Sequence, residues 1–105
     1  MNELYQINPE IYTAKNIIIF GTGVHAKYTY NELLKKNIFV KFFADREINS
    51  ENKFLMGKAV IKEEEITKVE NYLVIIASAS WKIIEKRLRE KGIENIYVDV
   101  WRYIP

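Results

Sequence analysis

The residues best suited to bind a ligand follow a short apolar segment, Ile17 to Phe20, near the start of the chain. Gly21 and Gly23 come directly after it in the pattern G-x-G-x-x-A, which ends at Ala26. The first glycine permits a sharp turn, the second lets a phosphate approach the backbone, and the small third residue lets a helix pack close to the strand. The pattern predicts a loop that binds the phosphate of a nucleotide, with tight strand-to-helix packing as the alternative.

A bound phosphate would rest against the first backbone amides of the helix that follows this loop, because those amides have no partner within the helix. The predicted site therefore also contains Thr22, Val24 and His25. His25 is the single histidine and the only candidate for acid-base chemistry, with a packing role as the alternative. The sequence contains no Tyr-x-x-x-Lys pair and suggests no Ser-His-Asp or Cys-His arrangement, so we predict no catalytic residue.

Two later strand ends add polar residues to this predicted site. Asp45 ends an apolar strand 24 positions after Gly21, where an acid of a dinucleotide-binding domain contacts a ribose hydroxyl. A plain turn residue is the alternative for Asp45, and Arg46 beside it would contact a 2′-phosphate or another anion. Ser78 follows the apolar segment 72–77 and should face the glycine loop, because the carboxyl ends of neighbouring parallel strands share one crevice.

The acidic run Glu63, Glu64 and Glu65 has the composition of a carboxylate cluster. Adjacent carboxylates point in different directions on a helix, and acids in a first turn interact favourably with the helix dipole. We therefore interpret the run as the start of a helix rather than as a catalytic site. With no cysteine and one histidine, the chain offers no zinc site, and disulfides and thiol chemistry are excluded.

Apolar segments alternate with amphipathic ones, which predicts an α/β domain. Strands are expected at 16–20, 39–44, 59–61, 72–77 and 96–100, and helices at 24–36, about 62–66 and 81–91. Near-continuous apolar strands favour a parallel sheet that is covered on both faces, so we predict a doubly wound, Rossmann-like sheet in a single three-layer domain. The first helix should bury Ala26, Tyr30, Leu33 and Leu34, and the segment 54–56 should anchor a polar loop.

Length and composition limit the classes of partner. The 105 residues suffice for one domain, with residues 1–15 as an N-terminal flap and the apolar tail 100–105 as a contact for a second copy or a catalytic domain. The 16 Lys and Arg are interspersed with 14 Asp and Glu, which gives no support for nucleic-acid binding. No apolar run approaches the ~20 residues of a membrane span and no leader pattern is evident, so we expect a cytoplasmic protein without a membrane partner.

Over residues 16–99 these motifs make the chain resemble the Rossmann-like N-terminal domain of bacterial surface-polysaccharide enzymes. The resemblance is to the sugar O- and N-acetyltransferases of the sialic-acid and bacillosamine pathways, and to polysaccharide-biosynthesis sugar-nucleotide dehydratases. The acetyltransferase domain binds a UDP-sugar, which implies ligand contacts for Gly21, Gly23, His25 and Asp45, with Ser78 on the opposite side. Ala26 replaces the usual glycine, and the left-handed β-helix that carries acetyl transfer has no counterpart in these residues.

The sequence thus predicts a domain that binds a nucleotide or nucleotide sugar in bacterial surface-polysaccharide biosynthesis. It would serve as a module of a larger transferase or sugar-nucleotide-modifying enzyme, and its ligand would be a UDP-sugar or NAD(P). One alternative is the NAD(P)-binding domain of an oxidoreductase or epimerase. The other is a non-enzymatic Rossmann-fold interaction module.

Overall fold

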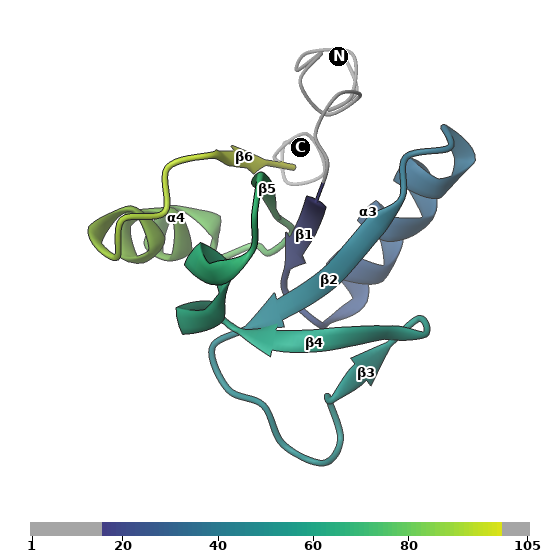
Figure 1. Ribbon diagram of the computed structural model, residues 1–105. Coiled ribbons are helices and arrows are strands. Elements are labelled where there is room, and N and C mark those ends of the chain that lie inside the picture. Colours follow the sequence, from purple (N-terminus) through teal and green to yellow (C-terminus); the bar gives the residue numbers. More distant parts are fainter. Residues whose placement is uncertain (1–15, 100–105) are drawn as a thin grey trace.

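The central strand of the sheet is β1 (Asn16–Phe20), which pairs in parallel with β2 on one side and with β5 on the other. The computed structural model describes residues 16–99, and these form an α/β domain whose six-stranded sheet has the order β3-β4-β2-β1-β5-β6 (Figure 1). The further strands are β2 (Val40–Asp45), β3 (Phe54–Leu55), β4 (Lys58–Lys62), β5 (Tyr72–Ile76) and β6 (Ile96–Val98). The helices are α3 (Val24–Lys35), the 3₁₀ helix η1 (Glu63–Lys68) and α4 (Trp81–Glu90).

Helices cover both faces of the sheet because successive strand residues point to opposite sides. On β1, Ile17 and Ile19 pack in one apolar cluster with Ala26 and Leu33 of α3. Residues Ile18 and Phe20 belong to a second cluster, which contains Ile66 of η1 and Leu88 of α4. All these side chains are at most 3 % exposed, so the predicted apolar strands are the core of the domain.

The prediction of an all-parallel sheet was wrong at one edge, because β3 pairs antiparallel with β4. A two-residue turn joins them, with Met56 at φ 52° and Gly57 at φ 77°. Positive φ at both central positions gives the twist that suits a tight hairpin. The segment 54–56 is therefore part of a hairpin, in which Leu55 packs against the apolar cluster of β1 and α3 while Phe54 and Met56 are exposed. The sequence did not suggest a hairpin, because methionine is an unusual residue at the first turn position.

The inner face of α3 also differs from the prediction. Leu34 is 42 % exposed, whereas Thr29, which the apolar pattern did not select, is 2 % exposed. The Thr29 hydroxyl donates a hydrogen bond to the carboxylate of Asp99, directly after β6. The polar group is thus buried because a residue far away in the sequence supplies its acceptor.

Two of the sequence predictions concern segments at the ends of the chain. The expected flap at 1–15 and the apolar tail at 100–105 both lie outside the described residues.

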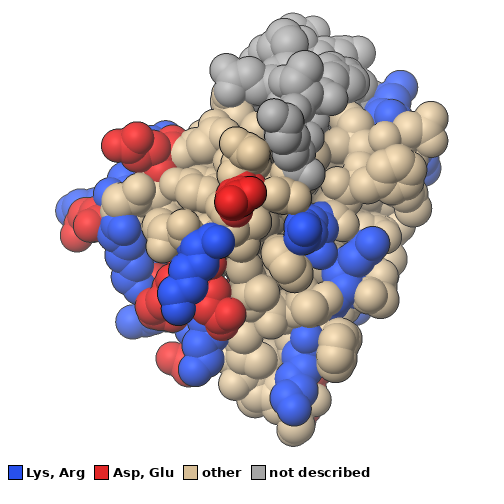
Figure 2. All heavy atoms as spheres, in the orientation of Figure 1, with Lys and Arg blue, Asp and Glu red and all other residues tan. Residues whose placement is uncertain are grey.

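Within residues 16–99, no helix combines the length and the apolar character needed to cross a membrane. Acidic and basic side chains interleave on the left of the view in Figure 2, the side on which α4 lies in Figure 1.

The two glycines of the first loop should respond differently to substitution. Gly21 has φ +129°, and a Cβ atom there would lie 2.9 Å from the carbonyl oxygen of Ala77. Gly21→Ala should lower the free energy of unfolding by about 2 kcal/mol or more, through backbone strain and this contact. Gly23→Ala is the matched control, because a Cβ at Gly23 meets nothing within 4 Å, and its cost should stay below about 1 kcal/mol. Urea unfolding measures both, and equal costs would contradict the close approach.

Candidate functional site

A crevice of about 260 Å³ lies at the carboxyl ends of β1, β2 and β5. The strand order places the crevice at the point where the chain crosses from one half of the sheet to the other. Here β2 lies on one side of β1 and β5 lies on the other. Ligands of open α/β sheets bind at such a position. Its lining consists of Phe20, Gly21, Thr22, Gly23, His25, Asp45, Ala77, Ser78 and Ile84.

Backbone hydrogen bonds hold the strand ends at the base of this crevice. The Gly21 amide donates to the carbonyl of Ala44 at 2.8 Å, and the Ala77 amide donates to the carbonyl of Phe20 at 3.0 Å. The first bond holds the start of the loop after β1 against the end of β2, and the second holds the residue after β5 against the end of β1. A tight approach of three chain segments therefore forms the floor of the crevice.

The first turn of α3 points its amides toward the same space. Gly23 is the N-cap residue, no side chain caps this helix end, and the first turn contains no acidic residue. Neither a capping side chain nor an acid of the first turn therefore offsets the positive end of the helix dipole. Since Gly23 also has no side chain, an anionic group can reach these amides, and the site is suited to hold a phosphate.

Asp45 lies at the rim with both carboxylate oxygens oriented by the protein. Its Oδ2 accepts a hydrogen bond from the Thr22 hydroxyl at 2.6 Å, and its Oδ1 accepts one from the Arg46 amide at 2.7 Å. Each carboxylate oxygen can accept a second hydrogen bond. Asp45 is half-buried in the crevice lining and is held ready to accept hydrogen bonds from ligand hydroxyl groups.

The other predicted site residues divide into two groups. His25 and Ser78 line the crevice, and the Ser78 hydroxyl accepts a hydrogen bond from the Ser80 amide at the start of α4. The oxygen of Ser78 is thus used at the start of α4, while its hydroxyl proton stays available to a ligand. By contrast, Val24 and Arg46 are exposed and are not part of the crevice lining.

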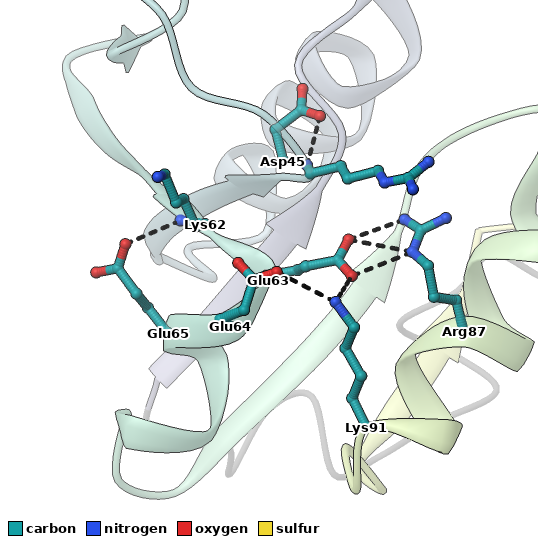
Figure 3. Close-up of polar contacts among 8 residues, drawn as sticks. Asp45, Lys62, Glu63, Glu64, Glu65, Arg87 and Lys91 are labelled. Atoms are coloured by element: carbon teal, nitrogen blue, oxygen red, sulfur yellow. Dashed lines mark hydrogen bonds and ion pairs between the residues drawn. The ribbon is translucent and has the colours of Figure 1, made fainter.

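Sequence reasoning missed a buried ion cluster that joins η1 to α4 beside the crevice (Figure 3). The side chain of Glu63 is fully buried, and both of its carboxylate oxygens accept bonds from Arg87. Lys91, the C-cap residue directly after α4, forms ion pairs with Glu63 and Glu64. The interpretation of this acidic run as the start of a helix holds for η1, but Glu63 also has a specific tertiary role.

Two opposing effects act on the pKa of Glu63. Burial disfavours the charged carboxylate and raises the pKa, whereas the hydrogen bonds and positive charges of Arg87 and Lys91 lower it. The cations prevail, so the pKa of Glu63 lies below its ordinary value.

Within residues 16–99, no three His, Cys, Asp or Glu side chains lie close enough together to hold a metal ion.

The lowered pKa makes stability depend on pH in a defined direction. Unfolded glutamate titrates at about 4.3, so the Glu63 contribution is complete above that pH and is lost as the pH falls through the lower folded value. Glu63→Gln should lower the free energy of unfolding by about 2 kcal/mol at pH 7, and this deficit should shrink toward pH 3. Urea unfolding at several pH values measures it. Glu70→Gln, at an exposed carboxylate, is the control, and a deficit that is constant down to pH 3 would contradict this role of Glu63.

Comparison with known proteins gives one family for this chain. The family described as C2185-like, N-terminal, matches residues 13–98, a range that includes the glycine loop, Asp45, Ser78 and the ion cluster. No curated protein matches the chain. Because the match extends over most of the sequence, the chain belongs to the family of C2185-like N-terminal domains.

Proposed function

We propose that this domain binds a nucleotide or nucleotide sugar in the crevice at the carboxyl ends of β1, β2 and β5. The strand order and the helices on both faces support a doubly wound, Rossmann-like arrangement, in which this position is the usual place for a nucleotide. The domain would act in the cytoplasm as the ligand-binding module of an enzyme of bacterial surface-polysaccharide biosynthesis, in line with the sequence resemblance.

The observation that carries this proposal is the pairing of two complementary features in one crevice. The uncapped amino end of α3 attracts a negatively charged group. Asp45, on the adjacent strand β2, accepts hydrogen bonds from hydroxyl groups and disfavours a negative charge beside it. A ribose phosphate has both features, an anionic end and a diol.

The nature of the crevice favours a mononucleotide over a dinucleotide. Its volume of about 260 Å³ lies below the usual range of roughly 300–1,000 Å³ for ligand pockets. A UDP-sugar can place its ribose and phosphates here and extend its sugar into solvent or toward another domain. NAD(P) is the second candidate, because the spacing from Gly21 to Asp45 also fits the adenosine ribose of a dinucleotide.

Ligand binding can be tested with UDP, UDP-N-acetylglucosamine, NAD, NADP and CoA as probes, by titration calorimetry and thermal shift. We expect UDP and the UDP-sugar to bind and to raise the melting temperature. Gly23→Val should weaken UDP binding at least about ten-fold, because its side chain would cover the amides of α3. Ser50→Val, on the exposed loop between β2 and β3, is the control. Preference for NAD would select the second candidate, and no binding by any probe would refute the proposal.

The role of Asp45 can be tested with a ligand that lacks the ribose hydroxyl from which Asp45 would accept a hydrogen bond. Wild-type protein should bind UDP about ten-fold more tightly than 2′-deoxy-UDP, since the deoxy ligand leaves the oriented carboxylate without a partner. Asp45→Asn should weaken UDP binding and remove most of this difference, because the amide is a poorer acceptor. Thr22→Val, which removes only the hydroxyl that orients Asp45, should give an intermediate result. An unchanged ratio in Asp45→Asn would mean that the ribose lies elsewhere.

A further inference from the structure

We propose that Arg87, which lies next to the crevice but outside its lining, contacts the second phosphate of a nucleoside diphosphate bound there. The inference rests on the proposed function and extends it, because it specifies that the ligand has two phosphates. It assigns a role to the buried ion cluster, which the glycine-loop pattern does not include.

Two contacts place the Arg87 guanidinium at the carboxyl edge of the sheet. Its Cζ atom lies 5.9 Å from the ring centroid of Phe20, the last residue of β1 and part of the crevice lining. Its anchor Glu63 directly follows Lys62, which is in register with Asp45. The guanidinium is thus bordered by the end of β1 and by the residue that follows β4, on the α4 side of the crevice.

Arg87 also has hydrogen-bonding capacity to spare. Its Nε and Nη2 atoms donate to Glu63, at 3.1 and 2.9 Å for the shortest bonds, while Nη1 donates to none of the described residues. Figure 3 shows one guanidinium nitrogen directed away from the Glu63 carboxylate. The side chain is 24 % exposed, so ligand atoms can reach it from solvent. A guanidinium held in this way is well suited to donate to a phosphate oxygen.

The cluster pairs two carboxylates with two cations. Glu63 is bonded to both Arg87 and Lys91, and Lys91 also pairs with the exposed Glu64. The cluster therefore has no net charge, and what it offers a ligand is the oriented guanidinium of Arg87 with its unused N–H group. Glu63 is a positioning residue, because it holds the guanidinium over Phe20 and does not itself line the crevice.

The two phosphates of such a ligand would contact different parts of the protein. The amides of α3 would receive the phosphate next to the ribose, since Asp45 and the glycine loop line the same crevice. A second phosphate that extends toward α4, on the side of the crevice lined by Ile84, would approach Arg87 one helical turn further along. The site is thus expected to discriminate between a nucleoside diphosphate and a nucleoside monophosphate.

The experiment compares UDP, UMP and uridine as probes for three proteins. Arg87→Met should weaken UDP binding about ten-fold, weaken UMP binding much less, and leave uridine within about two-fold of wild type. Lys91→Met is the matched control, because it removes the other cation of the same cluster, and UDP affinity should then stay within about two-fold. Arg87→Lys, which keeps the charge but not the planar fork, should recover part of the UDP affinity.

A second measurement follows ligand binding in the wild-type protein and uses a variant only for assignment. In the wild-type NMR spectrum, the Arg87 Nε-H resonance, identified by its absence in Arg87→Lys, should shift on saturation with UDP and stay in place with uridine. An unmoved resonance, or equal losses of UDP and uridine binding in Arg87→Met, would overturn the inference while UDP binding by the wild type keeps the proposed function. Absence of binding by all probes, NAD included, would refute both.

Discussion

The close approach of the β1 loop to the end of β5 is the constraint on which the rest of this domain depends. A side chain at Gly21 would meet the carbonyl of Ala77 at 2.9 Å, so the chain can pass only where a Cβ atom is absent. This passage brings the amino end of α3 over the carboxyl edge of the sheet. It also allows Ala26 to be fully buried against the strands. The crevice is a consequence of this packing, because it forms where β2 and β5 leave β1 on opposite sides.

A buried cluster of charged side chains joins η1 to α4. A fully buried glutamate on η1 requires partners, and these are Arg87 of α4 and Lys91 at the C-cap of the same helix. The ion cluster therefore fixes η1 and α4 relative to each other on one face of the sheet. Because Arg87 also covers the ring of Phe20, the same interaction forms part of the surroundings of the crevice. Stability of the α4 face and the electrostatics of the candidate site are thus linked through one buried carboxylate.

Sequence patterns predicted most of the site because its parts follow strand ends. Gly21 directly follows β1, Asp45 is the last residue of β2 and Ser78 lies two residues after β5, and parallel strands bring such positions to one edge. Arg87 could not be predicted, since a basic residue in the last half of a helix is equally typical of a solvated, dipole-compatible position. Nor could the burial of Thr29, whose acceptor Asp99 is 70 residues away in the sequence.

The amino-acid sequence by itself determined the α/β class, the strand β1 with its glycine loop, and the ends of most helices, because these depend on local periodicity and on residues such as Gly92 at φ 85°. Tertiary structure decided which carboxylate is buried, which strand runs antiparallel, and which cations meet Glu63. These outcomes depend on contacts between segments that are distant in the chain, and the free energy of such contacts is set by burial and by available partners. Local patterns carry no information on either.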